Sequence, residues 1–197
     1  VVGTHLVHPN DHVNLCQSSN DVIPTATHLA ALIQIKEKLI PALELLRDNL
    51  ATKTDEFWSV IKTGRTHLQD ATPIRLGQEF QGYTGQIERG LRRLLYAKHE
   101  LSEVALGGTA VGTGVNAHPQ FASAVCRRIS DIAGVDIKET DNHFQAQNTL
   151  DAVVAASGVL RTLGISLQKI ANDIRWLGSG PRAGLGELLL PAVQPGS

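Results

Sequence analysis

The chain has 197 residues, of which 42% are hydrophobic and 19% are charged, and its formal net charge is −1. This composition is that of a globular domain and excludes a disordered chain, and the lack of a polybasic run argues against binding to nucleic acid or an anionic membrane. No apolar run approaches the roughly 20 residues that a membrane span requires, and the two cysteines, Cys16 and Cys126, stand outside any CxxC or metal-binding spacing, which predicts free thiols.

The first predicted helix follows residues 1–20, which lack a steady period and are interpreted as a loop. Asn20 or Asp21 is a suitable N-cap. Beyond it, apolar side chains recur at three-and-four spacing: Leu29, Leu32, Ile33, Leu39, Ile40, Leu43, Leu46 and Leu50. This period predicts a long helix. Pro41 lies inside it and is expected to bend the helix or to end one half of it.

The remaining elements alternate between polar segments and helical periods. Residues 53–76 are polar, and 64–73 within them are interpreted as a loop. A second helical run begins near Phe80 and ends at Gly107, and the Gly/Thr-rich segment that follows, 107–118, is predicted to be a loop. A short helix is predicted over 119–133, closed by Gly134, and a third long run covers 150–177.

The three long runs decide the predicted fold class. Each has roughly 25–30 residues, which corresponds to about 40 Å of helix. Helices of that length with wide apolar stripes belong in a bundle. Strand patterns are nearly absent, so the predicted class is all-α, a long-helix bundle. The polar segments lie at helix ends, and we expect the chemistry there.

Two of these segments are candidate sites. Residues 17–21 place two hydroxyls and an amide where a helix begins, and the N–H groups and positive dipole end of such a start suit a carboxylate. Simple capping is the commoner role for such residues. Residues 64–73 combine Arg65, His67 and Asp70 with hydroxyls, and an imidazole can relay protons near neutral pH. The alternative is a structural polar loop whose histidine is satisfied by hydrogen bonds.

Three further segments carry weaker patterns. Residues 107–116 look like a phosphate-binding loop, but they lack the Lys-Ser/Thr pair of a P-loop and follow a helix, which excludes nucleotide binding. Close backbone packing, or substrate contact through amide groups, is expected instead. His8 lies beside an amide and a carboxylate in 7–11, where a structural histidine is the commoner case. Arg182 is a candidate anion ligand, or a partner in a salt bridge.

Taken together, five blocks span essentially the whole chain in this order: HPNDHVN, CQSSNDVIPTA, TGRTHLQDATP, LGGTAVGTGVNAHP and KIANDIRWLGSGPR. They resemble the class II fumarases of the fumarase/aspartase superfamily. The closing Pro-Gly-Ser is similar to the opening of that family's signature loop, GSSIMPGKVNP. We therefore expect residues 1–197 to be part of the family's central helical domain, without its N-terminal domain and C-terminal part, and to be inactive alone.

The resemblance implies reversible hydration of fumarate to (S)-malate, a tricarboxylic acid cycle reaction, by anti addition or elimination of water through an aci-carboxylate. Aspartase, an ammonia-lyase of the same superfamily, is the close rival. It typically has glutamine at the position of His67 and valine at that of Thr72, and the segment from Ile170 to Trp176 is also similar to the fumarase version. An inactive helical oligomerisation fragment is a third hypothesis.

The resemblance also implies substrate and catalytic roles. Ser18, Ser19 and Asn20 match residues that bind a substrate carboxylate at a helix start, and Thr66 matches a second substrate contact. His67 matches the catalytic histidine, which acts with a water on the hydroxyl side. Stabilising the doubly charged intermediate carboxylate should be the largest catalytic term.

The resemblance implies further roles for Ser197 and for residues 8–11, and it implies an assembly. Ser197 matches the candidate base for the C3 proton, and a serine needs nearby cations or donors for that role. A second dicarboxylate site is implied at His8, Pro9, Asn10 and Asp11. The family implies a homotetramer with active sites shared between subunits and a small dicarboxylate as ligand, without metal, cofactor, nucleic acid or membrane. The expected location is the cytoplasm, or the mitochondrial matrix in a eukaryote.

Overall fold

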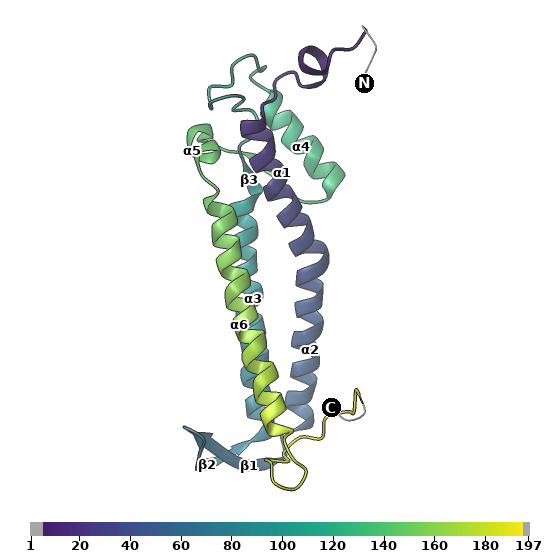
Figure 1. The fold of residues 1–197 in the computed structure, drawn as a ribbon, viewed down its shortest axis with the longest axis vertical. Coiled ribbons are helices and arrows are strands. Elements are labelled where there is room, and N and C mark those ends of the chain that lie inside the picture. Colours follow the sequence, from purple (N-terminus) through teal and green to yellow (C-terminus); the bar gives the residue numbers. More distant parts are fainter. Residues whose placement is uncertain (1–5, 195–197) are drawn as a thin grey trace. The chain divides into compact units, whose positions relative to one another are not determined.

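The computed structural model describes residues 6–194, and its elements are shown in Figure 1. It divides into two compact units: the first comprises Val1–Arg47 and Leu91–Val159, and the second comprises Asp48–Gly90 and Leu160–Ser197. In chain order the elements are η1 (Pro9–Val13), α1 (Ser19–Gln34), η2 (Ile35–Leu39), α2 (Ile40–Glu56), β1 (Ile61–Thr66), β2 (Gln69–Arg75), α3 (Leu76–Ser102), β3 (Glu103–Val104), α4 (Phe121–Ala133), β4 (Lys138–Glu139), α5 (His143–Asn148) and α6 (Asp151–Leu177). The predicted all-α class is confirmed, because the strands within residues 6–194 form only two small two-stranded sheets.

Helix α1 begins two or three residues earlier than predicted. Its N-cap is Ser18, whose hydroxyl accepts a hydrogen bond from the backbone N–H of Asn20 at 3.2 Å. In return, the carboxylate of Asp21 accepts from the N–H of Ser18 at 2.9 Å, which completes a capping box. Asp21 is therefore the third residue of the first turn, and the prediction that Asn20 or Asp21 is the N-cap is wrong.

The helix continues through Pro41, and the irregularity comes before the proline. Residues Ile35–Leu39 form one turn of π-helix, η2, and Pro41 is the second residue of α2. A proline has no N–H, and its ring collides with the carbonyl four residues earlier. Widening the preceding turn accommodates both effects without ending the helix, as π-turns inside helices commonly do.

The core of the first unit is aliphatic, as the low aromatic content implies. Leu94 and Leu101 of α3 are fully buried, and Cys126 of α4 lies almost fully buried as well. Each buried leucine of this kind contributes about 1.5–3 kcal/mol of hydrophobic stabilisation. Helix α4 ends as predicted at Gly134, whose φ of 64° gives the left-handed C-cap.

Two elements of the first unit have no counterpart in the sequence prediction. Strand β3 follows α3 directly and pairs in parallel with β4, with Glu103 opposite Lys138 and Val104 opposite Glu139. The short helix α5 lies between β4 and α6. Both elements are too short to show a period, so a period-based prediction passes over them.

The second unit contains a β-hairpin where a polar loop was predicted, so that prediction is wrong. Strands β1 and β2 are antiparallel and pair from Ile61 opposite Arg75 to Thr66 opposite Gln69. The register shifts between Thr63 and Arg65, where Gly64 of β1 lies opposite two residues of β2, Ala71 and Thr72. An added Cβ at Gly64 would meet a carbonyl oxygen of the opposite strand, so a glycine fits this position best.

Behind the hairpin, the second unit is held together by aromatic and aliphatic packing. The rings of Phe57 and Phe80 meet edge to face with centroids 5.1 Å apart, and Phe80 meets Tyr83 in the same way at 5.5 Å. Leu163 of α6 packs against Gly90 of α3, where any side chain would overlap it. Burial and nearby carboxylates raise the pKa of Tyr83, whose hydroxyl lies 3.2 Å from Asp173.

Helix α6 is long and apolar enough to cross a membrane by length and composition alone, contrary to the expectation that no run reaches that size. It is the one such helix among residues 6–194, and only 17% of its most apolar window is buried. A core helix of a soluble bundle passes the same test when its apolar stripe is wide. The finding therefore identifies α6 as a helix with a large apolar surface.

Candidate functional site

The start of α1 presents three polar side chains in different states. The hydroxyl of Ser18 is used in the helix cap, whereas Ser19 is exposed and its hydroxyl has no hydrogen-bond partner within the described part of the chain. The amide of Asn20 donates to the carbonyl of Ala110 at 2.7 Å, which leaves its own oxygen available. Ser19 and Asn20 therefore offer unused polar groups at the positive end of the helix dipole.

The buried carboxylate of Asp21 fastens this helix start to the glycine-rich segment. Asp21 is 0% exposed, and one of its oxygens accepts hydrogen bonds from the backbone N–H groups of Gly107 at 3.1 Å and Thr109 at 2.9 Å. With the bond from Ser18, three backbone donors converge on one side chain. Sequence reasoning missed this role, because nothing in the local pattern of Asp21 shows a partner 86 positions away.

The segment after α3 is predicted as a closely packed loop, and the structure confirms this. Gly107 has a φ of 103°, and an added Cβ would overlap the side chain of Ala122. Because Asp21 already occupies the amide groups of Gly107 and Thr109, those two groups are not available to a substrate. Gln147 of α5 donates to the carbonyl of Thr109 at 2.8 Å and fixes the loop from its other side.

Two hollows flank the start of α1 in the first unit. An open groove of about 1010 Å³ is lined by α1, the glycine-rich loop and α5: Ser19, Asn20, Ile23, Pro24, Thr27, Ala110, Val111, Phe144, Gln147, Asn148, Thr149 and Leu150. A smaller hollow of about 440 Å³ is lined by Asn10, Asn14, Gln17, Ser18, Ser19 and Val22. The structure thus brings Asn10, Ser18 and Ser19 to one pocket, and Ser19 borders both hollows.

His8 is the N-cap of η1, whose first residues are Pro9, Asn10 and Asp11, and the local role of His8 is structural. Its Nδ1 lies 3.2 Å from the backbone N–H of Asp11 and 3.1 Å from the carboxylate of the same residue. The N–H of His8 donates to the ring of His12 at 2.8 Å. Pro9 occupies the first position of the turn, where its missing N–H costs nothing. All of these residues are exposed, so they remain accessible to a ligand.

His67 and Thr66 lie in the second unit, at the tip of the β1–β2 hairpin. His67 and Leu68 are the two turn residues, with φ values of 52° and 62°. Two-residue hairpin turns need positive φ at both central positions, and Asn-Gly is the usual solution. A bulky pair in this conformation is strained, and such strain concentrates at functional sites. His67 is exposed, and its ring has no hydrogen-bond partner among residues 6–194.

An ion-pair network lies behind this tip. Arg65 of β1 contacts Glu187 at 2.7 Å, and Lys62 of the same strand lies 2.7 Å from both Glu187 and Glu79. The hydrogen bond with Glu187 raises the pKa of Arg65. Burial alone would raise the pKa of Glu187, but hydrogen bonding and charge from Arg65 and Lys62 outweigh it, so that the pKa is lowered. Sequence reasoning missed Glu187 because the loop after α6 shows no period or motif around it.

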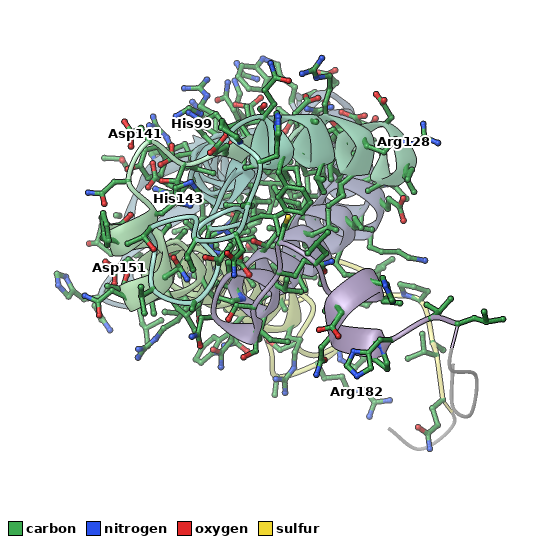
Figure 2. The ribbon with its side chains drawn as sticks, turned by 90° about the horizontal axis from the view of Figure 1, so that it is seen from above. His99, Arg128, Asp141, His143, Asp151 and Arg182 are labelled. Atoms are coloured by element: carbon green, nitrogen blue, oxygen red, sulfur yellow. The ribbon has the colours of Figure 1, made fainter. Side chains whose placement is uncertain are left out.

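Other polar groups lie away from the predicted site. Arg182 is exposed in the loop after α6 and has no ion-pair partner in the described residues (Figure 2). In the first unit His143 is held by the carbonyl of Ala105 at 3.0 Å and by Glu139 at 3.1 Å, which makes it structural. Among residues 6–194 no three His, Cys, Asp or Glu side chains are grouped so as to hold a metal ion. Ser197, the predicted base, lies outside the described residues.

Comparison with known proteins extends over the whole chain. Residues 1–197 match a family model described as Lyase. The class II fumarate hydratase of Neisseria meningitidis is 56% identical over 191 residues, which is 97% of this chain and 41% of that protein. The mitochondrial fumarate hydratase of Dictyostelium discoideum is 55% identical over 192 residues, 98% of this chain and 40% of that protein.

Solved structures agree with the sequence comparison. A recombinant class II fumarase from Schistosoma mansoni has a TM-score of 0.94 and 39% identity, covering 98% of this chain and 43% of that one. A fumarate lyase:delta crystallin from Brucella melitensis, bound to cobalt, has a TM-score of 0.92 and 48% identity, covering 97% and 41%. The chain spans about two fifths of the length of these relatives. With its whole length matched by the family model, the chain belongs to the lyase family.

Proposed function

We propose that the protein containing this chain catalyses the reversible hydration of fumarate to (S)-malate. The observation that carries the proposal is the 56% identity, over 97% of the chain, with a protein named fumarate hydratase class II. The groups that the reaction needs are present: hydroxyls and an amide at a helix start, and a free imidazole on a strained turn. The chain is part of the central helical domain of this enzyme.

In this proposal one substrate carboxylate binds at the start of α1. Ser19 supplies its unused hydroxyl, and Asn20 supplies the second N–H of its side-chain amide, the first of which donates to Ala110. Ser18 shapes the turn through its cap. The backbone N–H groups and the dipole of a helix start favour negative charge, and this preference grows as the carboxylate gains its second charge in the aci-carboxylate intermediate. Interactions that strengthen in that intermediate lower the barrier, and they do so more than ground-state binding does.

The two proton transfers are assigned to residues other than those at the start of α1. Removing the C3 proton of malate requires a base on one face, and assisted departure of hydroxide requires an acid on the opposite face. We assign the base to Ser197 and the acid, acting through a water, to His67, with Thr66 as a second substrate contact. The exposure of His67 at a hairpin tip supports this, since its ring nitrogens are free to reach a ligand. The reaction needs only proton transfer and charge stabilisation, so no cofactor is invoked.

Assembly into a homotetramer with shared active sites is part of the same proposal. Large apolar side chains are exposed on the long helices, including Leu95, Tyr96, Val154, Ile165 and Trp176. Monomeric soluble proteins rarely leave so many uncovered. Packing with other copies would cover them, and symmetric copies would bring different helix ends to a common site. Such an enzyme would work in the tricarboxylic acid cycle, in the cytoplasm or, in a eukaryote, in the mitochondrial matrix.

The second dicarboxylate site, at His8, Pro9, Asn10 and Asp11, also remains a proposal. Asn10 shares the 440 Å³ hollow with Ser18 and Ser19, which supports a ligand near the main site. The carboxylate of Asp11 repels an anion, so Asn10 is the residue most suited to contact one.

The test is a turnover assay on the full-length protein, followed by the absorbance of the fumarate double bond. We expect malate to give fumarate, and aspartate to give none. His67→Asn should lower kcat by about a hundredfold, as loss of a general acid–base group does. His118→Asn is the matched control, because His118 is exposed and the one hydrogen bond of its ring within residues 6–194 is accepted from the N–H of Gln120. Ammonia release from aspartate, or a tetramer that ignores both acids, would refute the proposal.

A further inference from the structure

The carboxylate of Glu187 joins three parts of the second unit. It contacts Arg65 at 2.7 Å with one oxygen and Lys62 at 2.7 Å with the other, and Lys62 also reaches Glu79 at the start of α3. The side chain of Lys62 is 7% exposed, that of Glu187 is 16% and that of Arg65 is 24%. Exposed ion pairs contribute little, but a shielded group of charges with short contacts holds its geometry.

Lys62 and Arg65 both reach this carboxylate from β1, across an irregularity in the hairpin. In a regular strand, positions 62 and 65 point to opposite faces, because successive side chains alternate. The register shifts between Thr63 and Arg65, where β2 has one residue more than β1. The alternation of burial along β1 also breaks there, because Gly64 and Arg65 are both half-buried. The irregularity thus coincides with the two cations that Glu187 holds.

The backbone around Glu187 is held in place by hydrogen bonds. Its N–H donates to the carbonyl of Leu177, the last residue of α6, at 2.8 Å, and Leu188 donates to the same oxygen at 3.1 Å. The N–H of Gly186 donates to the carbonyl of Ser179 at 2.7 Å. The loop is thus closed onto the end of α6, and the carboxylate is presented from a rigid support.

The hairpin needs such a support. A two-stranded hairpin is at best marginally stable by itself. The first five residues of β2 are exposed, and the two turn residues, His67 and Leu68, carry positive φ. Little apolar burial therefore fixes the direction of the tip.

We propose that Glu187 is a positioning residue, which holds Arg65 and Lys62 and thereby fixes the hairpin tip that carries His67. Arg65 is two positions from His67, so a change in the strand is transmitted to the turn directly. The inference rests on the proposed role of His67 in fumarate hydration. Its structural part, the anchoring of residues 61–75 by Glu187, can be measured without activity.

The experiment compares three variants of the full-length protein. Glu187→Gln keeps the shape of the side chain and removes its charge, whereas Glu187→Asp keeps the charge and shortens its reach. Glu56→Gln is the matched control, because Glu56 pairs with Lys53 at 2.6 Å on an exposed surface of the same unit. The readouts are kcat and KM for fumarate, and amide hydrogen exchange of residues 61–75.

We expect kcat of Glu187→Gln to fall about tenfold or more, because small displacements of a catalytic group are costly. KM should stay within about threefold, since the carboxylate site at α1 is unchanged. Glu187→Asp should recover part of kcat, and hydrogen exchange of 61–75 should rise only in the Glu187 variants. A folded Glu187→Gln protein with wild-type kcat and unchanged exchange would overturn the inference.

Two further outcomes also bear on the inference. If Glu187→Gln does not fold, Arg65→Lys takes its place, because an ammonium cannot reproduce the planar guanidinium contact. The same fall in kcat is expected there, and wild-type kcat would overturn the inference. If the unmodified protein does not hydrate fumarate, the proposed function fails, while the exchange measurement still decides whether Glu187 anchors the hairpin.

Discussion

The carboxylate of Asp21 and the backbone N–H of Thr109 form a 2.9 Å hydrogen bond across 88 positions of the chain. The bond joins the first turn of α1 to the glycine-rich loop. The shape of the hollows beside Ser19 therefore depends on a side chain that touches neither of them.

Replacing Asp21 with alanine should destabilise the protein strongly. Three backbone N–H groups, those of Ser18, Gly107 and Thr109, would lose their acceptor, and the last two are buried. Each unsatisfied buried donor costs about 1–3 kcal/mol, so we expect a loss of about 2 kcal/mol or more in the free energy of unfolding. Urea denaturation of the full-length protein measures it. Asp131→Ala, at an exposed position of α4, should change stability by less than about 0.5 kcal/mol. An equal change in both would contradict the prediction.

Gly107→Ala should be destabilising for two separate reasons. Its φ of 103° strains any side chain, and the new methyl group would overlap Ala122. We expect a loss of about 2–3 kcal/mol in the free energy of unfolding. The double variant with Ala122→Gly should recover part of this loss, because it removes the overlap and leaves the backbone strain. Thermal denaturation of the two variants tests the separation, and equal melting temperatures would show that the overlap does not matter.

Stability should depend on the ionisation of Glu103 in acid. A hydrogen bond from Thr140 lowers the pKa of Glu103; burial opposes this, and Lys138 and His99 add to the lowering. A carboxylate whose folded pKa lies below its unfolded value of about 4.3 stabilises the fold above that value. This contribution is lost as the pH falls through the folded pKa. Unfolding measured from about pH 7 to pH 3 should therefore show a smaller acid loss for Glu103→Gln than for the wild type. Parallel curves would contradict the assignment.

The two cysteines should differ sharply in reactivity. Burial, with a smaller contribution from Glu139, raises the pKa of Cys126 to about 11, and its thiol is almost inaccessible. Cys16 is only half-buried and lies near the carbonyl of Asn116 at 3.2 Å. Because the thiolate is the reactive form, iodoacetamide at about pH 8 should label Cys16 first. Mass spectrometry of the two peptides checks this, and Cys126→Ser should leave the fast labelling unchanged. Faster labelling of Cys126 would refute it.

The long helices were predictable because each repeats its apolar period many times. The run that ends at Gly178 gives α6. Gly134 closes α4 through a left-handed cap, which depends on local chemistry alone. The hairpin was not predictable in the same way. Its strands have six and seven residues, and polar side chains follow both faces of β2, so no alternation shows where it pairs. The β-branched residues Ile61, Thr63 and Ile74 were the one available pointer to strands.

The candidate site was likewise predictable only in part. The residues proposed to contact a ligand, such as Ser19 and His67, stand in motifs that a sequence displays directly. The residues that hold them in place do not, because Asp21 and Glu187 act through partners 86 and 122 positions away. Their roles depend on tertiary contacts, which cannot be read from a single sequence.

The turn at His67 and Leu68 has a consequence for engineering. Asn-Gly would suit its backbone better than the native pair, since it removes the left-handed penalty at both positions. A screen that rewards heat resistance alone would therefore drift toward Asn-Gly and discard the imidazole. Under the proposed role of His67, heat resistance and turnover compete at this turn, and any library covering it should be selected for both properties together.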